Sequence, residues 1–332
     1  MGGTLLILGA GASRPYFFPT STELRKLILG AAKYRDILTE TLAVDADKVR
    51  EFIVASGRFY TPNFNRDPQL LAPDWRTKVN LPGLALDQAF DQLGRLSELE
   101  GFKARFFDSG RMSIDAFVQR CGYKEQASIA VAFFLLMCER EELLDGDWYQ
   151  QLLEAIMQAP DRFLEHPFRV LNFNYDRSFE RFFRRTIKEA FRDDRKTRDA
   201  LITALTPNYV YGNLGSLEEG NAITYGSLSA IKDAARTLDF CRARSGGETL
   251  LSGETLVNIS KVIFLGFSFW PENVERLGLE TLNGRKVFST AYQMPKSVME
   301  FVKRRVDNIY FGARDHTALD FIREEGLFDF GA

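Results

Sequence analysis

The sequence has few residues that bind metals or form disulfides. Its 332 residues include three cysteines, at positions 121, 138 and 241, and two histidines, at positions 166 and 316. No two cysteines form a Cys-x-x-Cys pair, so the spacing excludes a zinc knuckle and a disulfide framework, and we expect no bound metal. Cysteine usage of this kind, and an N-terminus with no basic stretch before its first apolar run, lead us to expect a cytoplasmic protein.

The sequence also lacks an excess of charge of either sign. Lys and Arg together number 43 and Asp and Glu 45, for a net charge of −2. Because this balance gives no overall basic field, we expect no direct binding to nucleic acid. Residues 177–198 are rich in arginine, but acids and aromatics are interleaved with them, which is typical of a solvated helix face.

Long apolar runs are missing as well. The longest run, residues 127–138, has about twelve residues, whereas a helix that spans a membrane needs about twenty. This run therefore predicts a buried helix, and we expect no membrane-spanning segment.

The most informative feature that is present lies near the N-terminus. An apolar run, residues 4–8, leads directly into a glycine turn made of Gly9, Ala10, Gly11, Ala12 and Ser13. Glycines let a pyrophosphate approach the backbone, and the free N–H groups that open the following helix face such an anion. Arg14 occupies the place of the third glycine in a dinucleotide fingerprint, and no Lys-Ser or Lys-Thr pair follows, which excludes a P-loop. A turn whose glycines serve packing alone remains an alternative.

A second apolar run, within residues 168–173, is followed by Asn174 and Asp176. Ligands bind at the carboxyl ends of the strands in open α/β sheets, which makes Asn174 a candidate site residue. Asp176 can cap the helix that begins there. The alternative is that both residues serve only as turn and cap residues.

A third apolar run, residues 261–265, ends in the same way. It is followed by a glycine, a hydroxyl and an amide, at Gly266, Ser268 and Asn273. Glycine allows close approach of a ligand, and the other two supply hydrogen-bonding groups. Three strand ends with small or amide residues favour one shared nucleotide site.

The order of these segments indicates the fold class. Strands are predicted at residues 4–8, 168–173, 209–211, 261–265, 286–289 and 308–311, and helical segments follow them. This alternation predicts an α/β protein with a Rossmann-like parallel sheet, helices on both faces, and a helical insertion after the first strand and helix. We expect residues 1–30 and 165–332 to form the nucleotide-binding core, and residues 31–164 the insertion, with a surface loop at 63–84.

These motifs together resemble the sirtuin-like proteins. The resemblance rests on the GAGAS turn at 9–13, a Pro-Thr pair ending at Thr20, the Asn-Tyr-Asp at 174–176, and the Leu-Gly-Phe-Ser at 265–268. The longer phrases at 174–180 and 263–269 are similar, more narrowly, to the bacterial sirtuin-like domains of antiphage defence.

The resemblance implies NAD as substrate or ligand. Gly9, Ala10, Gly11 and Ser13 would then cradle its pyrophosphate, and Gly266 and Ser268 would contact its adenosine side. We expect Ala12, Thr20 and Asn273 to belong to the same cofactor site. Asn174 matches the asparagine that contacts the nicotinamide ribose and aids loss of nicotinamide, and Asp176 matches the acid that follows it.

The sequence departs from the family at two places. The structural zinc of the deacylases has no cysteines to hold it, so we expect no protein deacylation. The family's general-base histidine precedes a glycine after the Asn-Tyr-Asp, whereas here the corresponding residue is Tyr211 or Leu214. Tyr209 or Tyr211 could orient a ribose hydroxyl, but a tyrosine with a pKa near ~10 is a poor base at neutral pH.

Two functional hypotheses follow. The first is an NAD glycohydrolase that depletes NAD in antiphage defence. The second is a catalytically weak or inactive subunit that binds NAD or another nucleotide, or acts as a scaffold, in a defence complex. The aromatic residues near 106–107, 130–137 and 179–183 suit a core, and part of them could form a contact between copies of the chain or with a partner protein.

Overall fold

The computed structural model describes residues 2–30, 82–139, 144, 146–218, 222–223, 228–240, 249–251 and 253–330. The chain divides into two compact units. The sheet unit comprises Met1–Tyr16, Leu144–Asn213 and Arg242–Ala332, and the helical unit comprises Phe17–Leu143 and Leu214–Cys241. Cys241 and positions 63–81 of the expected surface loop lie outside the described residues; helix α5 begins at Pro82.

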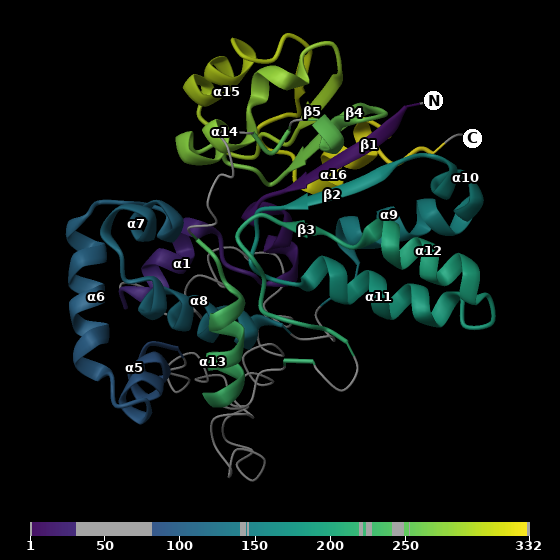
Figure 1. Cartoon of the computed structure of the whole chain (residues 1–332). Coiled ribbons are helices and arrows are strands. Elements are labelled where there is room, and N and C mark those ends of the chain that lie inside the picture. The colour runs from purple at the N-terminus through teal and green to yellow at the C-terminus, as the bar shows by residue number, and fades with distance from the viewer. Residues whose placement is uncertain are drawn as a thin grey trace, which may run out of the picture. The chain divides into compact units, whose positions relative to one another are not determined.

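A six-stranded parallel sheet forms the centre of the sheet unit (Figure 1). The strand order is β3-β2-β1-β4-β5-β6. The strands are β1 (Gly3–Leu8), β2 (Phe168–Asn172), β3 (Asn208–Tyr209), β4 (Ile259–Leu265), β5 (Lys286–Ser289) and β6 (Ile309–Phe311). Each of the six predicted strands is present within two residues of its expected ends. The Rossmann-like α/β class, with a helical insertion between β1 and β2, is therefore confirmed.

Strand β1 is central because its sequence suits burial on both faces. All six of its residues are buried, and Leu6 is paired with Val170 of β2 on one side and with Ile263 of β4 on the other. A strand covered on both faces reads as a continuous apolar run rather than an alternating one, as residues 4–8 do.

Helices flank the sheet. Those of the sheet unit are η1 (Ala10–Tyr16, a 3-10 helix), α9 (Asp147–Gln158), α10 (Pro160–Glu165), α11 (Ser178–Ala190), α12 (Arg195–Leu205), η5 (Gly253–Leu256), α14 (Pro271–Leu277), η6 (Leu279–Leu282), α15 (Lys296–Lys303) and α16 (Ala318–Glu324). Helix α12 packs on β2, and α9 contacts α10, α11 and α16. Figure 1 shows α9–α12 near the β1–β3 half of the sheet.

Helix α8 is the core of the helical unit. This unit contains α1 (Ser21–Ile28), α5 (Pro82–Gln92), α6 (Leu96–Asp108), α7 (Ile114–Cys121), α8 (Lys124–Cys138) and α13 (Leu228–Thr237). The other five helices all contact α8, and every residue of α8 from Ala127 to Cys138 is buried. A helix that is apolar on all sides requires such a surrounding, so the buried helix expected at 127–138 is confirmed.

The two units do not have the boundaries that the sequence analysis expects. Helices α9 and α10 belong to the sheet unit, although they were assigned to the insertion, and α1 and α13 belong to the helical unit. Two contacts account for part of this division. Trp148 of α9 binds the segment after β1, and α13 packs on α8.

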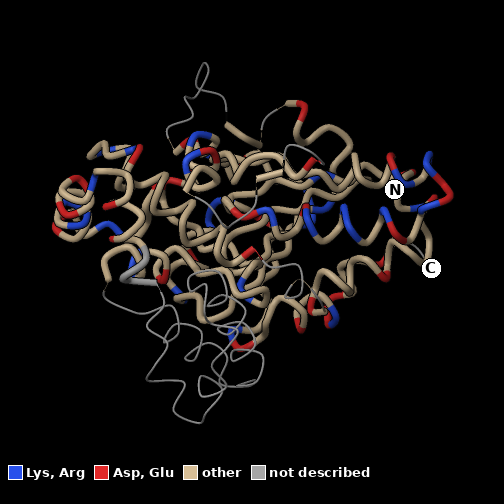
Figure 2. Tube along the Cα trace, turned by 90° about the horizontal axis from the view of Figure 1, so that it is seen from below, with Lys and Arg blue, Asp and Glu red and all other residues tan. Residues whose placement is uncertain are grey.

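The arginine-rich stretch only partly matches its prediction. Arg192 and Arg195 are exposed, but Arg177 is fully buried, so the expected solvated face is wrong at its first residue. In Figure 2 basic and acidic residues are interspersed over the described chain. Among the described residues, no helix has the length and apolarity that crossing a membrane requires.

The expected aromatic surface lies mostly in the core. Phe179, Phe182 and Phe183 are buried beside Tyr149, with ring centroids 5.6, 5.4 and 6.0 Å from it. In the helical unit Phe106 is buried, whereas its neighbour Phe107 is 66% exposed.

The pair Phe106 and Phe107 provides a matched test of the helical core. Phe106 packs on Phe117 at 4.8 Å between ring centroids, and the Arg25 guanidinium lies over its ring. We expect Phe106→Ala to lower the free energy of unfolding by about 3–5 kcal/mol in chemical denaturation. The control, Phe107→Ala on the same helix, should change it by no more than about 0.5 kcal/mol. Equal losses would contradict the assignment of the core.

Candidate functional site

The strand order places a topological switch point between β1 and β4. From β1 the chain continues to β2 on one side, while β4 begins the other half of the sheet. Ligands of open α/β sheets bind outside the carboxyl ends of the strands at such a point. The two glycine motifs of the sequence follow these two strands. Gly9 and Gly266 therefore each come directly after the carboxyl end of one central strand.

The two glycine turns pack backbone against backbone. Gly9 donates its N–H to Leu265 O at 2.9 Å, and Gly11 donates to Gly266 O at 3.0 Å. A Cβ on Gly266 would lie 2.0 Å from Ala12 N, and its φ is +60°. A Cβ on Gly9 would lie 2.5 Å from Gly266 O. Contact between the turns therefore requires these glycines whether or not a ligand is present, which supports the packing alternative.

The turn offers an anion fewer donors than the sequence analysis expects. The N–H groups of Gly9, Gly11 and Ala12 are all used within the two turns. Ala10, at the start of η1, is half-buried, and its N–H has no partner among the described residues. The Ala10 N–H is therefore the backbone donor that this turn leaves for a phosphate oxygen.

Asn174 binds the first glycine turn directly. Its Nδ2 donates to Gly9 O and to Ser13 Oγ, both at 3.0 Å. Gly9 O can only accept, so these contacts fix which end of the carboxamide carries the nitrogen. Asn174 is buried, yet its Oδ1 accepts no hydrogen bond from the described residues and keeps a small solvent contact. The Oδ1 is a free acceptor for a ligand hydroxyl.

Ser13 and Asp176 are buried, and both are bonded to protein groups. The Ser13 hydroxyl accepts from Asn174 and is hydrogen-bonded to Tyr149, so its hydrogen is not free for a phosphate. Asp176 Oδ1 accepts from the N–H of Ser178 at 3.1 Å and from the Ser178 hydroxyl. Helix α11 begins at Ser178 with Arg177 as its N-cap residue. Asp176 thus bonds the first turn from just outside it, which corrects the expected helix start.

Tyr211 and Asn273 are brought together by the fold. The Tyr211 hydroxyl donates to Asn273 Oδ1 at 2.6 Å, and the Arg276 guanidinium lies 4.7 Å from the Tyr211 ring centroid. Tyr211 is buried, and Asn273 lies in α14, after β4. The Tyr211 hydroxyl is thus already hydrogen-bonded to a protein side chain.

The loop after β4 has a strained backbone. Ser268 is exposed, and its hydroxyl has no partner among the described residues. The next residue, Phe269, has a φ of +53° and is buried against Phe264 and Phe267. A bulky side chain rarely adopts a positive φ, and such strain is frequent at ligand sites. Gly266, before it, donates its N–H to Thr290 Oγ1 at 2.8 Å.

Thr20 and the two histidines belong to other elements of the fold. Thr20 belongs to the helical unit, where it caps α1 through a reciprocal pair of bonds with Glu23. His166 ends α10, just before β2, and His316 follows β6 and lies 2.9 Å from Glu324. In the sheet, β4 and β5 lie between β6 and β1.

Two residues of α9 contact the site but were missed by the sequence analysis. Trp148 Nε1 donates to Ala12 O at 2.8 Å. Tyr149 stacks on Tyr16 with ring centroids 3.7 Å apart, and its N–H donates to the Tyr16 hydroxyl. Burial and the nearby Asp176 charge raise the pKa of Tyr149 well above its usual value. The aromatic pair at 148–149 lies far from any glycine motif in the sequence, which gave no signal for this contact.

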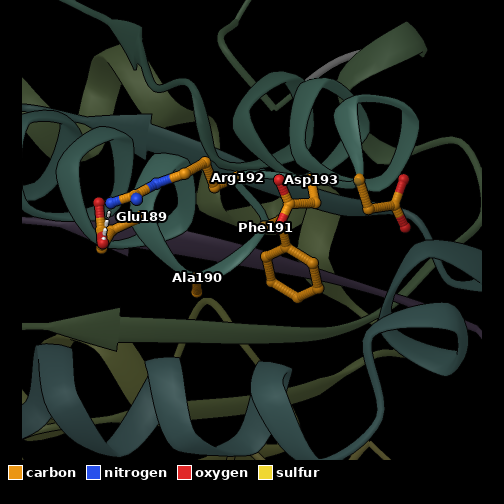
Figure 3. A pocket seen from close by; sticks show the side chains of 6 residues that line it. Glu189, Ala190, Phe191, Arg192 and Asp193 are labelled. Atoms are coloured by element: carbon orange, nitrogen blue, oxygen red, sulfur yellow. Dashed lines mark hydrogen bonds and ion pairs between the residues drawn. The ribbon is translucent and has the colours of Figure 1, made fainter.

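A separate hollow of about 370 Å³ lies where α11 leads into α12 (Figure 3). Residues 189–194 line it, and Arg192 forms an ion pair with Glu189. None of the predicted site residues lines this hollow. One contiguous, exposed turn forms it, so it is not the candidate site.

The fold and this edge of the sheet define a Rossmann-like α/β protein with paired glycine turns at its switch point. In comparisons with known proteins, no family model, curated protein or solved structure matches the chain. Among the described residues, no three His, Cys, Asp or Glu side chains gather in a way that could hold a metal ion.

The contact between the turns predicts the effect of a methyl group at Gly266. We expect Gly266→Ala to destabilise the protein by about 1–3 kcal/mol more than Gly284→Ala, because of overpacking. Gly284 also has a positive φ but has nothing within 4 Å of a Cβ, so it controls for backbone strain alone. Chemical denaturation measures both. Equal losses would show that the turns are not in close contact.

Proposed function

We propose that this chain binds NAD at the carboxyl ends of β1 and β4 and hydrolyses its nicotinamide–ribose bond. The observation that carries the proposal is the hydrogen bonding of the Asn174 carboxamide. Its amide nitrogen is bonded to the glycine turn, while its Oδ1 stays free beside the same turn. An oriented acceptor next to an anion-binding turn suits a ribose hydroxyl next to a pyrophosphate.

For this reaction the protein mainly has to orient the ribose and the phosphates of NAD. The C–N bond to nicotinamide breaks, its electron pair leaves with nicotinamide, and the ribose becomes an oxocarbenium ion. Water then adds to that carbon and releases a proton to solvent, which leaves ADP-ribose. Asn174 Oδ1 would accept from a ribose hydroxyl, and the Ala10 N–H would bind a phosphate oxygen. Fixed dipoles that face developing charge are the main source of such catalysis.

A second candidate, a subunit that binds NAD without turning it over, is favoured by a different observation. The Tyr211 hydroxyl is bonded to Asn273, and neither histidine lies in the segment directly after β1, β2, β3 or β4. Activation of water would therefore have to rely on the reactivity of the oxocarbenium ion. We place hydrolysis first because the Oδ1 of Asn174 accepts no hydrogen bond from the described residues and is therefore available to a ribose hydroxyl.

The cellular role that we propose is depletion of NAD in antiphage defence. It is supported by the resemblance of residues 9–13, 174–180 and 263–269 to sirtuin-like defence domains. In such a role the protein would work in the cytoplasm, as an oligomer or with a partner protein.

Replacement of Asn174 tests the proposal. Wild-type protein incubated with NAD should release nicotinamide and ADP-ribose, both detected by mass spectrometry. Asn174→Ala should lower this release by about 100-fold or more, as expected when one oriented polar group is removed from a transition state. Asn208→Ala, an exposed asparagine of β3, is the matched control and should keep full activity.

Other outcomes separate the candidates. No release by the wild type, with a melting temperature that rises with NAD, would favour the binding subunit. Neither release nor stabilisation would overturn NAD as the ligand. Gly11→Val is a poor probe of binding, because a Cβ at Gly11 would lie 2.8 Å from Gly266 Cα and would disturb the turns themselves.

A further inference from the structure

Five polar side chains form one continuous buried chain behind the glycine turn. Asn174 Nδ2 contacts Ser13 Oγ at 3.0 Å, Ser13 is hydrogen-bonded to Tyr149, and the Tyr149 hydroxyl lies 2.7 Å from Ser178 Oγ. Ser178 is bonded in turn to Asp176 Oδ1. All five residues are at most 5% exposed. They come from η1, α9, α11 and the loop after β2.

The carboxylate at one end decides the direction of every bond. A carboxylate has no hydrogen to give, so the single hydroxyl hydrogen of Ser178 goes to Asp176. The hydrogen between Tyr149 and Ser178 must therefore come from Tyr149. Tyr149 then accepts from Ser13, and the Ser13 oxygen accepts from Asn174. Such chains strengthen one another in a low-dielectric interior.

This order leaves one orientation for the Asn174 carboxamide. If the amide were reversed, its oxygen would face Gly9 O, which only accepts, and Ser13 Oγ, whose hydrogen is already given to Tyr149. The carboxamide oxygen of Asn174 would then face two buried acceptor oxygens with no hydrogen between them. The observed orientation directs Oδ1 away from the chain, where it is free.

We propose that Ser13, Tyr149 and Ser178 are positioning residues which, with Asp176, hold Asn174 with its oxygen presented to the ligand. The proposal rests on the proposed function for its consequence in catalysis, but the orientation itself is a property of the free protein. It assigns to Ser13 and Asp176 a role behind Asn174 instead of direct contacts with NAD.

The side-chain NH₂ signal of Asn174 in a ¹H–¹⁵N NMR spectrum tests this orientation without NAD. Asn174→Ala identifies the signal by its loss. Tyr149→Phe and Ser178→Ala remove links that do not touch Asn174. We expect each to shift the signal and to speed its exchange with solvent by about fivefold to tenfold, the effect of one weakened hydrogen bond. Tyr149→Phe keeps the ring that stacks on Tyr16.

Ser289→Ala is the matched control. Ser289 is fully buried in the same unit, and its hydroxyl is bonded to Thr290 O, outside the chain of five. It should leave the Asn174 signal unchanged. An unchanged signal in both Tyr149→Phe and Ser178→Ala, with each variant folded by circular dichroism, would overturn the positioning role.

Kinetics then connect orientation with turnover. Where the wild type hydrolyses NAD, Tyr149→Phe should lower kcat about tenfold while the Kd for NAD, measured by calorimetry, stays within about twofold, since one hydrogen bond of orientation is lost. A merely structural role would change both constants or neither, and that result would contradict the proposal. If the wild type releases no nicotinamide, the NMR result still decides the orientation, so failure of the proposed function and failure of this inference are distinguishable.

Discussion

The contact on which the site depends is the backbone packing between the turns after β1 and β4. Gly9, Gly11 and Gly266 bring two main chains closer than any side chain would allow. This close approach aligns the carboxyl ends of the two central strands. It also engages, in hydrogen bonds within the two turns, backbone N–H groups that could otherwise bind an anion. The Ala10 N–H is then the donor that remains at the turn. The close packing of the turns thus determines which backbone donor remains for the ligand that we propose.

Helix α9 also holds the segment after β1 in place. Trp148 binds the backbone of Ala12, and Tyr149 stacks on Tyr16 and joins the polar chain behind Asn174. The first turn of α9 therefore supports both the backbone of the glycine segment and the side chains beneath it. A helix that the sequence predicts to be part of an insertion in fact contacts residues of the candidate site.

The sequence predicts the sheet well, because the central strands β1 and β4 and their neighbour β2 are apolar runs, as parallel strands covered on both faces are. It also places Asn174 at a strand end. The hydrogen bond from Asn174 to Ser13 could not be predicted, since the two residues are 161 positions apart in the sequence. Nor could the loss of free amides, because a glycine that admits a ligand and a glycine that admits another backbone have the same local sequence. The pairing of Tyr211 with Asn273 likewise joins residues that are 62 positions apart, which no local pattern encodes.

The position of β1 in the sheet has a consequence for the order in which the protein assembles. Of the six strands of the sheet, β1 is made before the other five, and its neighbours β2 and β4 are separated from it by the helical insertion and by most of the described chain, respectively. Closing such long loops is entropically costly and slows folding. During synthesis, the turn after β1 cannot acquire its partner turn until β4 has been made. The candidate site is therefore completed late, and a partly synthesised chain would carry the first glycine motif without the second turn that it packs against.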